Sequence, residues 1–271
     1  MDRKIALGLT FSVIFSLGIV GCANKSGKSA SDEINPSTRT SFEGSPDFKR
    51  AALVNVELGL GYLSQGQVAR AKTKLTHAIK LAPNLPETHS AMAYFLEMVG
   101  ERKDAEREHK KAVNLSVNKG AVYNNYGAFL CRGNRFKEAD HAFQQALQDK
   151  EYSRTAEVYE NAGLCALKWS DHEKAQEYLL TAIRQDPSRS MALLELADLN
   201  IRQSKFNEAK AFLNRYRTVA EPSARSLWLG IQVAKALNDS NSTASQALLL
   251  KNLFEDSPEY QLYLKSEKSS T

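Results

Sequence analysis

The sequence has few of the side chains from which metal centres and catalytic sites are built. It holds five histidines and three cysteines among 271 residues. The histidines are scattered along the chain, with no His-Glu-x-x-His pair, no cluster with cysteine at metal-ligand spacing, and no Gly-x-Ser-x-Gly elbow elsewhere. Glu157 and Glu160 share a predicted helix face, but such pairs on a helix surface are far more often solvated or bound to a partner than catalytic. We therefore expect no enzyme, no cofactor and no metal site.

The sequence also lacks a strong charge of one sign. Its formal net charge is +5, and the lysines and arginines are spread along the chain while the aromatic residues fall at positions expected for a core. A nucleic-acid surface gathers both kinds of residue in one patch, so we expect no nucleic-acid partner. Gly59 and Gly61 could be mistaken for a nucleotide-binding loop, but no predicted strand precedes them and they have a role in helix packing. We therefore expect no small-molecule substrate.

The N-terminal residues 1–21 have the pattern of a bacterial export signal. Arg3 and Lys4 precede an apolar run from Ile5 to Leu17, which is interrupted by small and polar residues and is shorter than the roughly 20 residues of a membrane span. The junction before Cys22 resembles a lipobox, which predicts cleavage there and a lipid on the Cys22 thiol. In the lipoprotein-sorting pattern that this junction resembles, an aspartate directly after the cysteine retains the protein at the inner membrane. Ala23 stands at this position instead, so we expect an anchor in the outer membrane, on its periplasmic face.

After Cys22 the composition changes. Residues 22–45 are rich in Ser, Lys, Asn and Thr and predict a flexible tether with a span of roughly 25 to 30 Å. We expect a folded domain over residues 46–264 and a disordered tail over residues 265–271.

Two ladders of small residues recur through the predicted domain. One ladder consists of Ala71, Ala105, Ala139, Ala175 and Ala209, and the other precedes it by twelve residues with Gly59, Ala93, Gly127, Gly163 and Ala197. The period of about 34 residues, with small residues where two helices cross, resembles the tetratricopeptide repeat. This resemblance predicts an all-α, right-handed superhelix of about six helix pairs. In the second pair His109 replaces the usual large apolar residue, and in the sixth, degenerate pair we expect Ala244 to take the small-residue place two positions late.

The repeat register predicts which side chains line the concave surface. In the first two repeats these side chains are mostly apolar, and we expect a partner-binding groove at Leu53, Val56, Leu60, Leu63, Tyr94 and Met98. Later repeats place polar residues such as Asn124, Arg132 and Glu157 there. Either the apolar residues bind an amphipathic helix of a partner, or the segment from Phe42 to Phe48 folds back to cover them.

Cys131 and Cys165 remain after Cys22 is lipidated, and they lie one repeat apart on adjacent first helices. In an exported protein this offset allows a disulfide. Two small buried side chains fit the spacing equally well, so the residues alone leave both options open.

Several segments resemble the type IV pilus biogenesis lipoproteins of the PilF/PilW family. The resemblance extends from about Arg50 to Lys265, and it rests on the segments Leu58-Gly59-Leu60-Gly61-Tyr62-Leu63, Asn124-Asn125-Tyr126-Gly127, Glu195-Leu196-Ala197-Asp198-Leu199, Ala224-Arg225-Ser226-Leu227-Trp228-Leu229-Gly230 and Ser257-Pro258-Glu259-Tyr260.

This resemblance implies a pilotin, a monomeric lipoprotein that binds the pilus secretin and promotes the secretin's outer-membrane localisation and multimer assembly. Some members of the family carry cysteines that match Cys131 and Cys165, which favours the disulfide. Two alternatives are a lipid-anchored tetratricopeptide scaffold of the outer-membrane protein assembly machinery and a peptidoglycan or cell-envelope adaptor with no role in pili.

Overall fold

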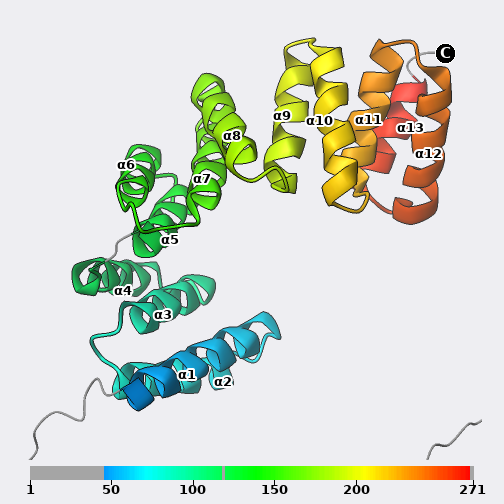
Figure 1. Ribbon diagram of the computed structural model, residues 1–271. Helices are drawn as coiled ribbons and strands as arrows, with labels where there is room; N and C mark the ends of the chain where they lie inside the picture. The colour runs from blue at the N-terminus through cyan, green and yellow to red at the C-terminus, as the bar shows by residue number, and fades with distance from the viewer. Residues whose placement is uncertain (1–45, 118–119, 269–271) are drawn as a thin grey trace, which may run out of the picture. The chain divides into compact units, whose positions relative to one another are not determined.

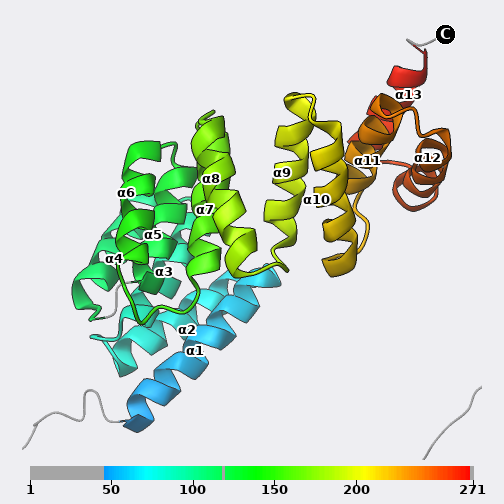
Figure 2. The ribbon, with the colours of Figure 1, turned by 45° about the horizontal axis from the view of Figure 1, so that its top comes forward.

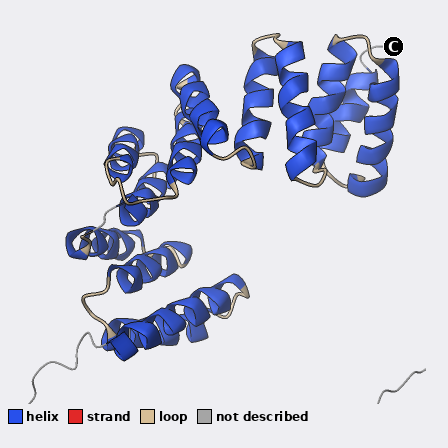
Figure 3. Cartoon of the chain, in the orientation of Figure 1, coloured by secondary structure: helices blue, strands red, loops and turns tan. Residues whose placement is uncertain are grey.

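The computed structural model describes residues 46–117 and 120–268, and these ranges contain thirteen α-helices and no strand (Figure 3). They belong to one compact unit, Ser41–Thr271. The helices are α1 (Pro46–Ser64), α2 (Val68–Leu81), α3 (Pro86–Met98), α4 (Arg102–Leu115), α5 (Gly120–Arg132), α6 (Phe136–Leu147), α7 (Thr155–Lys168), α8 (His172–Gln185), α9 (Ser190–Arg202), α10 (Phe206–Val219), α11 (Ala224–Ala236), α12 (Ser240–Phe254) and α13 (Pro258–Lys268). None of the described helices is both long enough and apolar enough to cross a membrane.

Helices α1 to α12 pack as six consecutive pairs (Figures 1 and 2). The second helix of each pair contacts the first helix of the next pair, and neighbouring first helices also touch, from α1 and α3 through α9 and α11. The predicted all-α array of tetratricopeptide helix pairs is therefore confirmed. Helix α13 packs against α11 and α12, and it extends to Lys268, past the predicted end of the domain at residue 264.

The small-residue ladders lie where the two helices of a pair cross. The five ladder alanines are fully buried, and a Cβ added at Gly59 or Gly163 would come within 2.7 Å of the leucine sixteen residues later, Leu75 or Leu179. Each of these glycines thus makes room for a large side chain of the second helix. Between the two helices of each pair the chain turns through one residue with left-handed backbone, and the residue type varies from glycine to asparagine and serine.

The sixth pair keeps this crossing but with other residues. Gly230 faces Gln246, again sixteen residues later, so Ser242 occupies the small-residue place. Ala244, predicted to occupy that place, is exposed, and this prediction is wrong. The reason is that Gln246 is buried against Gly230 and accepts a hydrogen bond from Arg217 at 2.6 Å, which fixes the rotation of α12.

Candidate functional site

The six predicted groove residues differ in accessibility. Leu53, Tyr94 and Met98 are exposed, with 40%, 44% and 58% of their surfaces accessible. Leu60 and Leu63 are half-buried and pack against the core of the first two pairs.

Val56 is not part of an open surface. It is buried in the same core, with 9% of its surface accessible. Val56 follows Ala52 by four residues and precedes Gly59 by three, so it shares the face of α1 that packs against the rest of the pair. The prediction that Val56 lines the groove is therefore corrected.

A cavity of about 330 Å³ lies beside Tyr94, which is part of its lining. It is formed by side chains from α1, α3, α4 and α5, and its lining consists of Leu60, Ser90, Ala91, Tyr94, His109, Asn125, Ala128 and Arg132. Leu60 and Tyr94 were among the predicted groove residues. The cavity thus joins the first three pairs at the apolar end of the array.

Two polar atoms of this lining are buried without a hydrogen-bond partner among the described residues, Ser90 Oγ and His109 Nε2. His109 has only 3% of its surface accessible, and burial lowers the pKa of its imidazole to about 4. The ring is therefore neutral near pH 7. Because an unsatisfied buried polar group costs free energy, a bound group that hydrogen-bonds to either atom would recover some of that cost.

A second hollow, of about 560 Å³, lies between α10, α11 and α12. It is larger, but two of its polar side chains, Arg217 and Gln246, are already hydrogen-bonded to each other at 2.6 Å. For this reason the cavity at the first three pairs is the better candidate for a partner site.

The polar residues that later repeats place on the first helices contact one another. Arg132 of α5 donates two hydrogen bonds of 2.7 Å to the Glu97 carboxylate of α3, and this contact raises the arginine pKa. Similar contacts join the following first helices or the residues that cap them, and they include Asn124 Nδ2 to Glu157 at 3.0 Å, Asn161 to Asn124 at 3.0 Å, Arg189 at the start of α9 to Glu160 at 3.2 Å and Arg225 to Asp198 at 3.1 Å. These side chains serve to hold successive pairs together.

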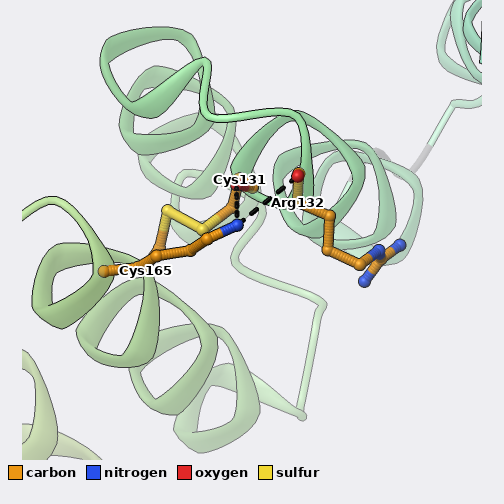
Figure 4. The surroundings of a disulfide bond; sticks show 4 residues. Cys131, Arg132 and Cys165 are labelled. Carbon is orange, nitrogen blue, oxygen red and sulfur yellow. Dashed lines mark hydrogen bonds between the residues drawn. A yellow bond between two sulfur atoms is a disulfide. The ribbon is translucent and has the colours of Figure 1, made fainter.

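Cys131 and Cys165 form a disulfide between α5 and α7 (Figure 4). Their Cα atoms lie 5.8 Å apart, within the range that a disulfide spans without moving the backbone. Lys168 of α7 donates to the carbonyl oxygens of Cys131 at 3.3 Å and Arg132 at 3.4 Å, so a cation also holds the C-terminal end of α5.

The predicted features of the N-terminal region lie outside the described residues. They are Cys22, the signal over residues 1–21 and the tether over residues 22–45. Of the segment suggested as a cap, Phe48 belongs to the first turn of α1, the helix that carries Leu53, so this residue does not fold back over the groove. In the described part of the chain no three His, Cys, Asp or Glu side chains gather as metal ligands would.

Sequence reasoning missed that His109 and Ser90 meet in one cavity. In the sequence, His109 is a break in the pattern of large apolar residues, and this break is the only signal of the site. The pairing with Ser90 depends on how α3 and α4 pack, which no spacing in the sequence reveals.

Comparison with known proteins agrees with this architecture. A tetratricopeptide repeat family model matches residues 168–224. The type IV pilus assembly protein PilF of Pseudomonas aeruginosa is 34% identical over 206 residues, which cover 76% of this chain and 82% of PilF. The structure of Pseudomonas aeruginosa PilF superposes with a TM-score of 0.72 at 33% identity, over 81% of this chain and 99% of that one.

The crystal structure of PilW, a widely conserved type IV pilus biogenesis factor, matches with a TM-score of 0.69 at 25% identity, over 79% of this chain and 98% of PilW. This chain is thus a homologue of pilus assembly factors and not an enzyme. Because it is more than 30% identical to PilF over most of that protein, it belongs to the PilF/PilW family of type IV pilus assembly tetratricopeptide repeat proteins.

Proposed function

We propose that this protein is a pilotin, an outer-membrane lipoprotein that binds the type IV pilus secretin and promotes the secretin's localisation and multimer assembly. The observation that carries the proposal is the likeness to the pilus assembly protein PilF across 82% of its length. The lipobox-like junction at Cys22 supports the membrane anchor, and a repeat array without a metal cluster in its described residues suits a binding role.

The secretin would bind at the first three pairs. Leu53, Tyr94 and Met98 present apolar surface on α1 and α3, and Tyr94 also lines a cavity large enough for a side chain. An amphipathic helix of the secretin would place its apolar face against this surface, and one of its side chains would enter the cavity. A side chain with an apolar body and a hydrogen-bonding tip would match the apolar wall and the unpaired atoms of Ser90 and His109.

The test is a deletion strain examined for surface pili and for secretin multimers that resist heat and detergent. We expect both to be lost and to return with the wild-type gene on a plasmid. Normal pili and normal multimers in the deletion strain would contradict the proposal. A general loss of outer-membrane proteins alongside normal pili would instead indicate a scaffold of the outer-membrane protein assembly machinery.

A further inference from the structure

Helix α2 is basic without any acidic residue. Its sequence contains Arg70, Lys72, Lys74 and Lys80. The second helices α4, α6, α8 and α10 of the following pairs carry cations too, but each also carries acidic residues. Since the whole chain has a formal net charge of only +5, a large part of its excess positive charge lies on this one helix.

The cations of α2 lie away from its packed face. Ala71, Leu75 and Ala78 are fully buried on the inner side, at spacings of four and three residues. On the outer side Lys72, Lys74, His77 and Lys80 line one shallow depression, together with uncharged residues that include Asn55 of α1. We call these four residues the α2 basic face.

The α2 basic face is not neutralised within the chain. Among the described residues, none of its three lysine ammonium groups forms an ion pair. On the second helices of the next pairs, by contrast, Lys110 pairs with Glu106 at 2.9 Å and Lys174 with Asp140 at 2.6 Å. Unpaired lysines on one face create a positive potential that attracts an anionic surface.

The position of α2 suggests which anionic surface this is. Helix α2 packs against α1, the helix that follows the segment leading from Cys22. We propose that the α2 basic face binds the anionic phospholipid surface of a membrane. This inference goes beyond the proposed function, because it gives the first helix pair a contact with lipid headgroups that requires neither the secretin nor the acyl chain.

The physical basis is the additive attraction of lysines to lipid phosphates. Each lysine close to an anionic bilayer increases the partition coefficient of the protein between water and the membrane surface by a factor of about five. A basic face beside the anchor would therefore orient the first pairs against the bilayer.

Vesicle binding tests the inference without the lipid anchor. Residues 22–271 carrying Cys22→Ser, which include the whole compact unit Ser41–Thr271, are mixed with vesicles of phosphatidylglycerol and phosphatidylethanolamine. We expect binding that is absent with phosphatidylcholine vesicles and that weakens as salt is raised from about 50 to about 500 mM. The Lys72→Glu/Lys74→Glu/Lys80→Glu variant is expected to bind at least ~100-fold more weakly, with an unchanged circular dichroism melt.

A matched variant separates this face from net charge. Lys150, Lys205 and Lys251 are exposed and form no ion pair among the described residues, so their joint replacement by Glu changes the charge equally. We expect this variant to bind anionic vesicles less than ~3-fold more weakly than the wild type. Equal losses in the two variants, or no preference for anionic vesicles, would overturn the inference. Loss of secretin capture by the α2 variant with unchanged vesicle binding would overturn it in favour of an acidic protein segment.

Discussion

Two buried histidines of the second pair show how differently the same residue is accommodated. His89 Nδ1 lies 2.6 Å from a Glu108 carboxylate oxygen and His89 Nε2 lies 2.7 Å from the Pro83 carbonyl oxygen, so both ring nitrogens are paired. His109 instead packs its ring against Phe129, with centroids 4.9 Å apart, and leaves Nε2 unpaired. His89 therefore has a structural role, while His109 occupies an apolar site at a cost.

The protonation of His109 predicts a pH dependence. Burial lowers its folded-state pKa from 6.5 to about 4, against an opposing effect of Glu97. Because the unfolded chain takes up the proton at a higher pH than the folded chain, the contribution of His109 to stability is fully present above pH 6.5. This contribution is lost as the pH falls toward about 4. The total loss from this group is about 3 kcal/mol.

Replacing His109 with leucine should remove this dependence. Leucine is the residue that stands at the matching place in the first, fourth and fifth pairs, as Leu75, Leu179 and Leu213. We measure the free energy of unfolding of His109→Leu and of the wild type by urea denaturation and take the difference between them at each pH. We expect this difference, in favour of the variant, to be about 2 to 3 kcal/mol larger near pH 4.5 than near pH 7.5. Parallel curves for the two proteins across this range would contradict the assignment.

At the scale of the helix, the small-residue ladders determined how much of the fold the sequence could predict. They identified the pairs because a glycine stands where Leu75 or Leu179 of the second helix crosses the first, and a Cβ there would come within 2.7 Å of the leucine. They failed at Ala244 because the sixth pair crosses through Gln246, a polar residue held by a hydrogen bond from another helix. A spacing rule contains no information about such a contact.

The candidate site shows the same limit. Leu53, Tyr94 and Met98 were predicted as surface residues from the repeat register, and they are exposed. Val56 was assigned to that surface as well, but the long α1 packs this residue against the core. The approximate face of a helix is thus predictable from the register, whereas burial also depends on the neighbouring helices.

The disulfide joins α5 to α7 and so braces the third pair against the fourth. Closing a loop of 34 residues restricts the unfolded chain, and in a chain-entropy account this contributes on the order of 3 to 4 kcal/mol. We expect the Cys131→Ser/Cys165→Ser variant to unfold at correspondingly lower urea concentration, and the wild type with a reductant to behave in the same way. Two free thiols titrated in the denatured, non-reduced mature protein would rule the bond out.

At the scale of the whole molecule, we propose that attachment to the membrane depends on Cys22. The charged start, apolar run and small residues before it predict that its thiol carries the lipid. We expect Cys22→Ala to abolish metabolic labelling with a fatty acid and to leave a soluble or inner-membrane species in cell fractionation. Labelling of the Cys22→Ala protein would show that the lipid is attached at another residue.

The central claim is that the first three pairs bind the secretin. Leu60 and Leu63 pack on the core, so replacing them would test folding as much as binding. Tyr94 and Met98 are exposed beside the cavity and are the better choice, and Met191 on α9, with 47% of its surface accessible, provides a matched control.

The most direct measurement is capture of the secretin by the purified Tyr94→Ser/Met98→Ser and Met191→Ser variants, with a circular dichroism melt of each. We predict at least tenfold weaker capture by the double variant, unchanged capture by the control and melts like that of the wild type, because only Tyr94 and Met98 would be buried by the partner. Unchanged capture by a double variant that melts normally would contradict the claim.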